Sequence, residues 1–455
     1  MNERLHDVSD ESEGTCSWIV PDFLRLRQQQ RGPFWIKGNP GVGKSTIMKY
    51  LFRREVLKSH SSADKVVVAF FCHGRGTDLQ RTKSGIYRTI LYQILLQDSV
   101  LRSQFEVDFQ QKCDTQGKYS EQWTWHEHEL ENYIRLYLQK ASVTMPVHVF
   151  VDALDECGEE SGRALLYFFR DLCEAPLDSE TLPSINICVS SRHYPFLDLE
   201  SQCSASPDKR NSQDIRLLVE QDREFLDALA CLRGEEAENL CAAIVSHAGN
   251  VFQWAVFVMR WIAKSLRAGE RLDVIHKKIE NSPKELYDLY HDVISSVQED
   301  DQAQMIRLLE WVQFSERALA VSELRYALAI NPDQPCASLA DFEESDDFAR
   351  NNEDMKKKIR RLSCGLIEVR KTTLPSPLSK RYGIANSDVE VAQSVHQSVA
   401  DWCISDKGLP LLLNQSAKTV IGDAQNRICK ACFGYLSAAR ITQQNSRQMA
   451  SDFRS

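Results

Sequence analysis

The chain has 455 residues, of which 43% are hydrophobic and 26% are charged, the composition of a globular protein with room for about three domains. The formal net charge is −9, so no dominant nucleic-acid surface is expected, because such a surface needs a basic field. The N-terminus lacks the apolar core of a signal peptide, and no apolar run is long enough to span a bilayer, so we expect a cytoplasmic protein without a membrane span.

The first half of the chain alternates strand and helix patterns. Apolar runs rich in β-branched and aromatic residues predict strands at 34–37, 66–71, 147–151 and 185–189. Apolar stripes at helical spacing predict helices at 47–52, 84–97 and 162–173. This alternation predicts an α/β fold with a mostly parallel sheet flanked by helices and with functional groups at the carboxyl ends of its strands.

Strand patterns become rare after residue 200. Helical spacing predicts helices at 220–232, 235–248, 251–268, 286–298, 305–314 and 321–329. One more helix is expected at 356–361, followed by two short strands at 366–369 and 389–395 and a helical segment at 410–447. We therefore expect an α-helical region and then a winged-helix-like domain after the α/β part.

A glycine-rich motif lies between the first predicted strand and the first predicted helix. It fits G-x-x-x-x-G-K-[ST], the phosphate-binding loop, and consists of Gly38, Asn39, Pro40, Gly41, Val42, Gly43, Lys44, Ser45 and Thr46. Its glycines permit backbone angles and close approaches that a Cβ would block, so successive N–H groups can form a nest for an anion. Lys44 can reach the outer phosphates, and the Ser45 hydroxyl can ligate Mg²⁺. The following helix adds its positive N-terminal end to this site.

Acidic and basic side chains follow the next strands. Asp152 comes directly after the run 147–151, as a Walker B aspartate does, and can hold Mg²⁺ through water. Glu156 is our first choice for the group that orients or deprotonates the attacking water, and Asp155 is the alternative. Arg192 could place its guanidinium on the γ-phosphate, or it could be a surface arginine in a turn. Together these residues predict a site for Mg²⁺ and a nucleoside triphosphate.

Several segments resemble the NACHT domain of fungal NLR-like STAND NTPases. They are FWIKGNPGVGKSTIMKYL, FFCHGRGTDLQRTKSGIYRTILYQIL, VFVDALDEC and ICVSSRHYP. Later motifs of the same family are resembled by GNVFQWA at 249–255, PKELYDLY at 283–290 and VHQSVADW at 395–402. The order of these segments makes the resemblance specific over residues 15–405.

The resemblance implies a division of the chain into five parts. These are an N-terminal lead-in (1–31), a NACHT P-loop NTPase domain (32–200), a helical domain (201–298), a winged-helix-like domain (299–405) and a C-terminal helical segment (406–455).

The resemblance also implies a cytosolic switch. ADP holds a closed state, and exchange for ATP opens the chain and permits homo-oligomerisation. Thr15 and Cys16 match the lead-in that contacts the base, and His396 is the candidate for a contact with the ADP β-phosphate, unless it is a structural core histidine. Family members usually carry an N-terminal effector domain and a C-terminal repeat array, so we expect a fragment or a minimal member whose effector and sensor partners are not identified by this sequence.

Three functions fit these residues. The first is a signalling switch that binds ATP/ADP with Mg²⁺ and hydrolyses ATP slowly. The second is a constitutive P-loop ATPase with continuous turnover. The third is a nucleotide-binding scaffold without turnover, against which the intact Lys44, Asp152 and Glu156 argue.

Overall fold

The computed structural model describes residues 3–29, 32–57, 65–74, 77–174, 185–193, 204–295, 297–330, 339–345, 347–373 and 388–452. The chain divides into two compact units, Met1–Ala255 and Val256–Ser455, and each has a sheet of its own. The unit boundary falls inside the predicted helical domain, and the five-part division stays a prediction.

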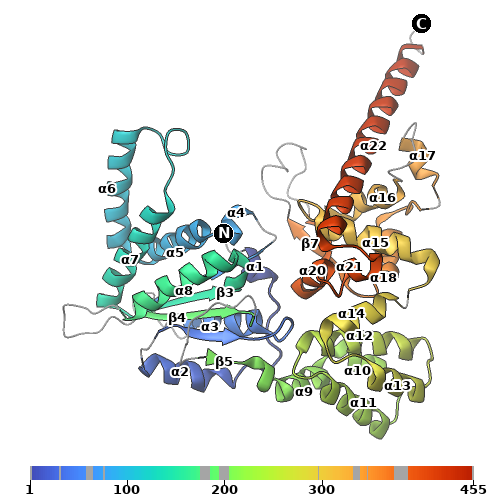
Figure 1. The fold of residues 1–455 in the computed structure, drawn as a ribbon, viewed down its shortest axis with the longest axis horizontal. Coiled ribbons are helices and arrows are strands. Elements are labelled where there is room, and N and C mark those ends of the chain that lie inside the picture. The colour runs from blue at the N-terminus through green and yellow to red at the C-terminus, as the bar shows by residue number, and fades with distance from the viewer. Residues whose placement is uncertain are drawn as a thin grey trace. The chain divides into compact units, whose positions relative to one another are not determined.

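The first unit is built on a five-stranded sheet with the order β2-β3-β4-β1-β5, in which every neighbouring pair is parallel (Figure 1). Its strands are β1 (Phe34–Lys37), β2 (Val66–Phe71), β3 (Val147–Asp152), β4 (Ile185–Ser191) and β5 (Ser204–Ala205). Lys37 pairs with Ser191, and Phe71 pairs with Asp152. The carboxyl ends of β1, β3 and β4 therefore meet at one edge, where parallel sheets carry their functional groups.

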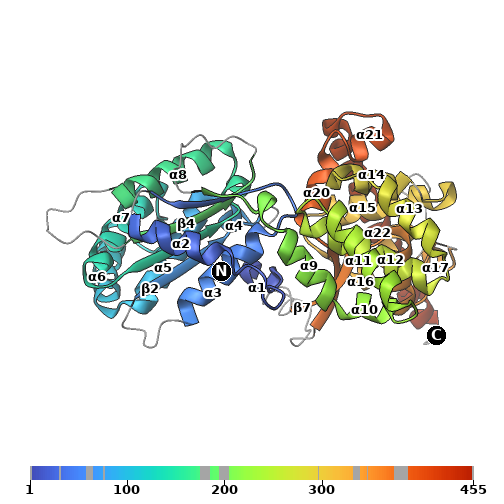
Figure 2. The same ribbon diagram turned by 90° about the horizontal axis from the view of Figure 1, so that it is seen from below.

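Helices cover both faces of this sheet (Figures 1 and 2). One face carries α5 (Lys83–Gln97), α7 (Glu127–Thr144) and α8 (Glu159–Glu174), and the other carries α2 (Ile19–Gln29) and α3 (Lys44–Leu57). Alternate residues of β2 enter the two cores, since side chains of a strand point to opposite faces in turn. This explains why the predicted strands read as continuous apolar runs.

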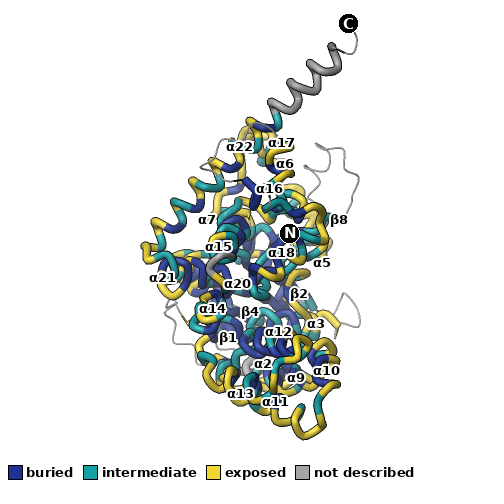
Figure 3. Tube along the Cα trace, turned by 90° about the vertical axis from the view of Figure 1, so that its right-hand side faces the viewer, coloured by how far each residue is buried: buried dark blue, intermediate teal, exposed yellow. Residues whose placement is uncertain are grey.

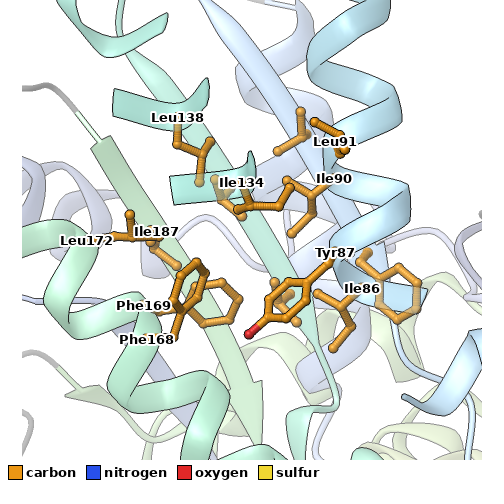
Figure 4. Packing of buried hydrophobic residues seen from close by; sticks show 14 of the residues in the cluster. Ile86, Tyr87, Ile90, Leu91, Ile134, Leu138, Phe168, Phe169, Leu172 and Ile187 are labelled. Atoms are coloured by element: carbon orange, nitrogen blue, oxygen red, sulfur yellow. The ribbon is translucent and has the colours of Figure 1, made fainter. Parts of the chain in front are cut away.

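The core between α5, α7 and α8 is the larger of the two in this unit. Figure 4 shows Ile90 of α5, Ile134 of α7 and Phe169 of α8 directed toward one another, and all three are 0% exposed. Burial of each such side chain stabilises the fold by about 1.5–3 kcal/mol. The strands below them are buried as well (Figure 3), so the strand ends are held on a rigid base.

The rest of the first unit is helical. Its elements are α1 (Glu3–Asp7), α4 (Asp78–Arg81), α6 (Ser99–Gln116), the 3₁₀ turns η1 (Leu154–Cys157) and η2 (Pro207–Lys209), α9 (Ser212–Gln221), α10 (Arg223–Leu229) and α11 (Gly234–His247), and α12 (Phe252–Arg267) crosses the unit boundary.

The second unit contains helices and a small antiparallel sheet of order β6-β8-β7. Its strands are β6 (Leu319–Ala320), β7 (Ile367–Thr373) and β8 (Asp388–Ser394). Its helices are α13 (Leu272–Asn281), α14 (Leu286–Ser295), α15 (Glu299–Phe314), α16 (Val321–Ala329), α17 (Leu339–Glu343), α18 (Asn352–Leu362), α20 (Gln397–Ile404), α21 (Leu409–Leu413) and α22 (Ala417–Asp452). The two predicted strands are confirmed as β7 and β8, while the winged-helix assignment stays a prediction.

One predicted helix was wrong. Residues 220–232 do not form a single helix, because α9 ends and α10 begins at Asp222. The Asp222 carboxylate accepts a hydrogen bond from the Phe225 N–H at 2.8 Å, which is the role of an N-cap residue. Within the described ranges, none of the helices combines the length and the apolar content needed to cross a membrane.

Candidate functional site

The glycine loop connects the buried strand β1 to α3. Gly41 and Gly43 have φ angles of 80° and 86°, in the left-handed region that favours glycine. Gly38 has no room for a side chain, because a Cβ there would lie 2.7 Å from Val42 Cγ2 and 2.9 Å from Asp208 Oδ2. The loop thus uses its glycines both for backbone angles and for a close approach, as the motif predicts.

Lys44, the first residue of α3, folds back over the loop. Its Nζ donates hydrogen bonds to the Gly38 carbonyl at 2.8 Å and to the Asn39 carbonyl at 2.9 Å. Burial lowers the pKa of this amine. The charges that also act on the pKa, in decreasing order, belong to Asp155, Arg192, Asp152 and Asp208. The ammonium group is therefore held at the loop among the carboxylates that follow the neighbouring strands.

Asp152 is the last residue of β3 and is 1% exposed. Its carboxylate accepts hydrogen bonds from the Ser190 hydroxyl at 2.5 Å and from the Ser45 hydroxyl. Burial raises the pKa of Asp152, and the two hydrogen bonds and the charges of Arg4 and Lys44 oppose this effect. The two predicted magnesium ligands, Ser45 and Asp152, are thus in direct contact.

Asp155 and Glu156 lie in η1 and both face Arg192. The Arg192 Nε is 3.1 Å from Asp155 Oδ2, the Arg192 N–H donates to Asp155 Oδ1 at 3.1 Å, and the Arg192 Nη2 is 3.9 Å from Glu156 Oε1. Glu156 Oε2 also accepts a hydrogen bond from the Gly74 N–H at 2.6 Å. Burial raises the pKa of Glu156 to about 7, while the Gly74 hydrogen bond and the charge of Arg4 oppose this effect. The structure therefore brings the two candidate bases and the candidate arginine together.

A buried asparagine supports the back of the loop. Asn211, directly before α9, is 0% exposed, and its Nδ2 donates to the Val42 carbonyl at 2.8 Å and to the Asn250 carbonyl at 3.1 Å. The Gln253 N–H donates to the Gly41 carbonyl at 3.0 Å. The loop is therefore tied to α9 and to the start of α12.

The lead-in is held by an aspartate from the same helix. Asp214 Oδ2 accepts hydrogen bonds from the Cys16 N–H at 2.7 Å and from the Trp18 Nε1 at 3.1 Å. The Thr15 hydroxyl donates to the Ser12 carbonyl at 2.7 Å, and Thr15 and Cys16 are both 4% exposed. The Cys16 N–H and the Thr15 hydroxyl therefore already donate to protein oxygens. A contact of Thr15 and Cys16 with a base stays a prediction.

His396 belongs to the second unit, where it is the N-cap residue of α20. Its Nδ1 accepts a hydrogen bond from the Ser398 N–H at 3.1 Å. The Ser398 hydroxyl is in turn 3.0 Å from the Tyr290 hydroxyl. His396 therefore has a capping role in its own unit, and its contact with a phosphate stays a prediction.

Sequence reasoning missed five residues that contact the site or the lead-in, or whose charge acts on the site. They are Arg4, Ser190, Asp208, Asn211 and Asp214. Ser190 directly follows a predicted strand, and this position could have indicated a functional residue, because functional groups lie at the carboxyl ends of parallel strands. Asp208 and Asn211 follow the two-residue strand β5, which was not predicted, and no motif marks Arg4 in α1 or Asp214 in α9.

The residues fit a nucleotide with Mg²⁺ on two observations. Gly41 and Gly43 hold the loop in left-handed backbone conformations, which let successive N–H groups form a nest for an anion. The hydroxyl of Ser45 and the carboxylate of Asp152 are the oxygen ligands that Mg²⁺ prefers. Among the described residues, His, Cys, Asp and Glu side chains form no group of three or more that could hold a metal ion.

A family model described as "Nephrocystin 3, N-terminal" matches residues 14–192, from the lead-in to Arg192. No curated protein matches the chain. Similar solved structures include Aeropyrum pernix ORC2 in ADPNP-ADP complexes, with 13% identity, 94% of this chain and 98% of that chain covered, and a TM-score of 0.35.

Drosophila ORC bound to DNA has 11% identity over 86% of each chain and a TM-score of 0.36. PCH-2 of C. elegans has 9% identity over 58% of this chain and 67% of that chain, with a TM-score of 0.29. Likenesses this low carry no argument about what this chain does. The parallel sheet, the glycine loop between β1 and α3, and the acidic end of β3 make the first unit a P-loop NTPase fold.

Proposed function

We propose that the chain is a nucleotide-dependent switch of the STAND type, which binds ATP or ADP with Mg²⁺ and hydrolyses ATP slowly. The observation that carries the nucleotide site is the cluster of Lys44, Ser45 and Asp152. A lysine that can hold polyphosphate and two oxygen ligands for Mg²⁺ come from two separate strand ends and meet at one loop. A solvated acidic turn after β3 would not bury Asp152 against the Ser45 hydroxyl.

Mg²⁺ would be held by Ser45 directly and by Asp152 through water, and it would neutralise charge on the phosphates. The protein residues then have distinct tasks. The amides of the glycine loop and Lys44 would orient the polyphosphate, and Glu156 would accept a proton from the attacking water.

Slow hydrolysis is supported by the partners of the reacting groups. Glu156, whose pKa is raised to about 7, is partly protonated at neutral pH and holds the Gly74 N–H. Arg192 is paired with Asp155 at 3.1 Å. Arg192 has to leave Asp155 before it can act on the γ-phosphate, and Glu156 has to lose its proton before it can act as a base. Turnover then depends on a rearrangement of the site as well as on nucleotide binding.

The switch itself is supported by the resemblance to NACHT proteins. In that scheme ADP holds a closed state, in which His396 contacts the β-phosphate, and ATP permits opening and homo-oligomerisation. The effector and sensor partners, and the cytoplasmic location, belong to the same proposal.

Two measurements test the proposal. First, the nucleotide that co-purifies with the protein is released by denaturation and identified by chromatography, and ADP is the expected result. Second, light scattering gives the mass of the protein loaded with ADP or with an ATP analogue. Identical monomers in both states would contradict the switch.

The steady-state rate separates the alternatives. A constitutive ATPase should turn over on the order of 10 times per second, whereas a switch should approach a single turnover. A scaffold without turnover should bind nucleotide and release no phosphate. The engaged states of Glu156 and Arg192 favour the slow rate.

A further inference from the structure

Asp208, in η2, accepts a hydrogen bond from an amide near the start of the phosphate loop. Its Oδ1 accepts a hydrogen bond from the Asn39 N–H at 3.0 Å. Its Oδ2 accepts one from the Ser206 hydroxyl at 3.1 Å and lies 3.1 Å from His193 Nε2. The Asp208 side chain is only 18% exposed. A carboxylate therefore engages an N–H group that the loop motif offers to an anion.

The same carboxylate is packed against the start of the loop. Its Oδ2 would lie 2.9 Å from a Cβ on Gly38, so glycine at this position leaves the room that Asp208 uses. Its negative charge also acts on Lys44. The hydrogen-bond partners of Asp208 given above are Asn39, Ser206 and His193, and neither Ser45 nor Asp152, the pair that would hold Mg²⁺, is among them.

We propose that Asp208 is a specificity-determining residue of the nucleotide site, which disfavours a nucleoside triphosphate relative to the diphosphate. This inference rests on the proposed function. Asn39 follows β1, which pairs with β4, and Arg192 at the end of β4 is the residue assigned to the γ-phosphate. Asp208 thus stands at the end of the loop where the outermost phosphate would lie.

The two nucleotides would meet this carboxylate differently. A diphosphate leaves Asp208 on the Asn39 amide. A triphosphate brings about one further negative charge toward Asp208 and competes with it for the amide. Asp208 would then bias the site toward ADP and would have to leave the Asn39 amide when ATP binds.

Isothermal titration calorimetry of the full chain with Mg–ADP and with the non-hydrolysable analogue Mg–AMP-PNP tests this inference. The variants are Asp208→Asn, which removes the charge and keeps the shape, and Asp208→Ala, which also frees the amide. In both, the ratio of the ADP dissociation constant to the AMP-PNP dissociation constant should rise about tenfold. Like charges that compete for one amide lie within a few ångströms of each other, where their repulsion at an effective dielectric constant of about 20 exceeds a tenfold effect, so tenfold is the smallest change expected after screening by solvent.

The control variant is Asp171→Asn, which removes an exposed carboxylate of α8 that is paired with Arg170. Its ratio should equal that of the wild type. An unchanged or lowered ratio in either Asp208 variant would overturn the inference, and so would weaker binding of both nucleotides, which would make Asp208 a structural anchor of the loop. If the wild type itself binds neither nucleotide, the proposed function fails first, so the two failures are distinguishable.

Discussion

Replacing Glu156 by Gln should change the pH dependence of stability and of turnover together. Glutamine keeps the size of the side chain and an oxygen that can accept the Gly74 hydrogen bond. It removes only the ability to ionise. Because the wild-type carboxyl has a pKa of about 7 in the folded chain, against an ordinary value of 4.5, the substitution isolates the free energy of holding that charge in a buried position.

The sign of the effect follows from proton binding. Below pH 4.5 the carboxyl is protonated in both states. Between pH 4.5 and about 7 the unfolded chain loses this proton and the folded chain keeps it, so the free energy of unfolding falls as pH rises. A pKa difference of about 2.5 corresponds to about 3 kcal/mol, lost progressively up to pH 7 and fully absent above it.

Urea unfolding at half-unit steps from pH 4.5 to 8.5 measures this loss. The wild type should lose about 3 kcal/mol relative to Glu156→Gln across that range, and a Glu159→Gln control, at an exposed position of α8, should follow the wild type. Phosphate release by the wild type should rise with pH through about 7 and should be abolished in Glu156→Gln. Parallel stability curves for the wild type and Glu156→Gln would refute the raised pKa, and unchanged phosphate release in Glu156→Gln would refute its use as a base.

Three further substitutions test the rest of the site. Lys44→Ala should abolish nucleotide binding in calorimetry, and unchanged ATP affinity would reject the site assignment. Asp152→Asn should make ATP affinity insensitive to EDTA, whereas the wild-type affinity should fall when Mg²⁺ is removed; equal EDTA sensitivity would contradict the metal role. Asn211→Ala leaves two backbone carbonyls without their donor and should lower the free energy of unfolding by about 1–3 kcal/mol in urea titrations. Equal loss in the exposed neighbour Gln213→Ala would contradict that reason.

Strands β1 to β4 of the first sheet could be predicted because nearly all of their residues are buried. The run 66–71 was predicted from its β-branched and aromatic residues and is β2 at the same residues. The composition of such a run is enough to predict a strand, without knowledge of its neighbours in the sheet. The two-residue strands β5 and β6 carry no comparable signal, since their pairing with β1 and β8 depends on contacts between distant segments.

The position of the candidate site residues could be predicted only where they belong to a short motif or follow a predicted strand. Lys44, Ser45 and Asp152 belong to motifs that can be recognised within a short stretch, and the parallel order of the strands brings them to one edge. Asp208 and Asn211 follow β5, so the rule that functional groups lie after strands would have found them if that strand had been predicted. A missed strand of two residues therefore concealed two residues that contact the loop.

The pair of Arg192 and Asp155 shows why residue roles cannot be assigned one at a time. Sequence reasoning gave Arg192 to the γ-phosphate and kept Asp155 as an alternative base. With the guanidinium 3.1 Å from the carboxylate and Asp155 only 5% exposed, neither group can take its assigned role while the pair is intact. A triphosphate that draws Arg192 away would leave a buried carboxylate without its cation, a state that costs free energy unless the turn after β3 rearranges. Under the proposed function, the same contact would slow hydrolysis in this state and would give an arriving γ-phosphate a means of moving η1.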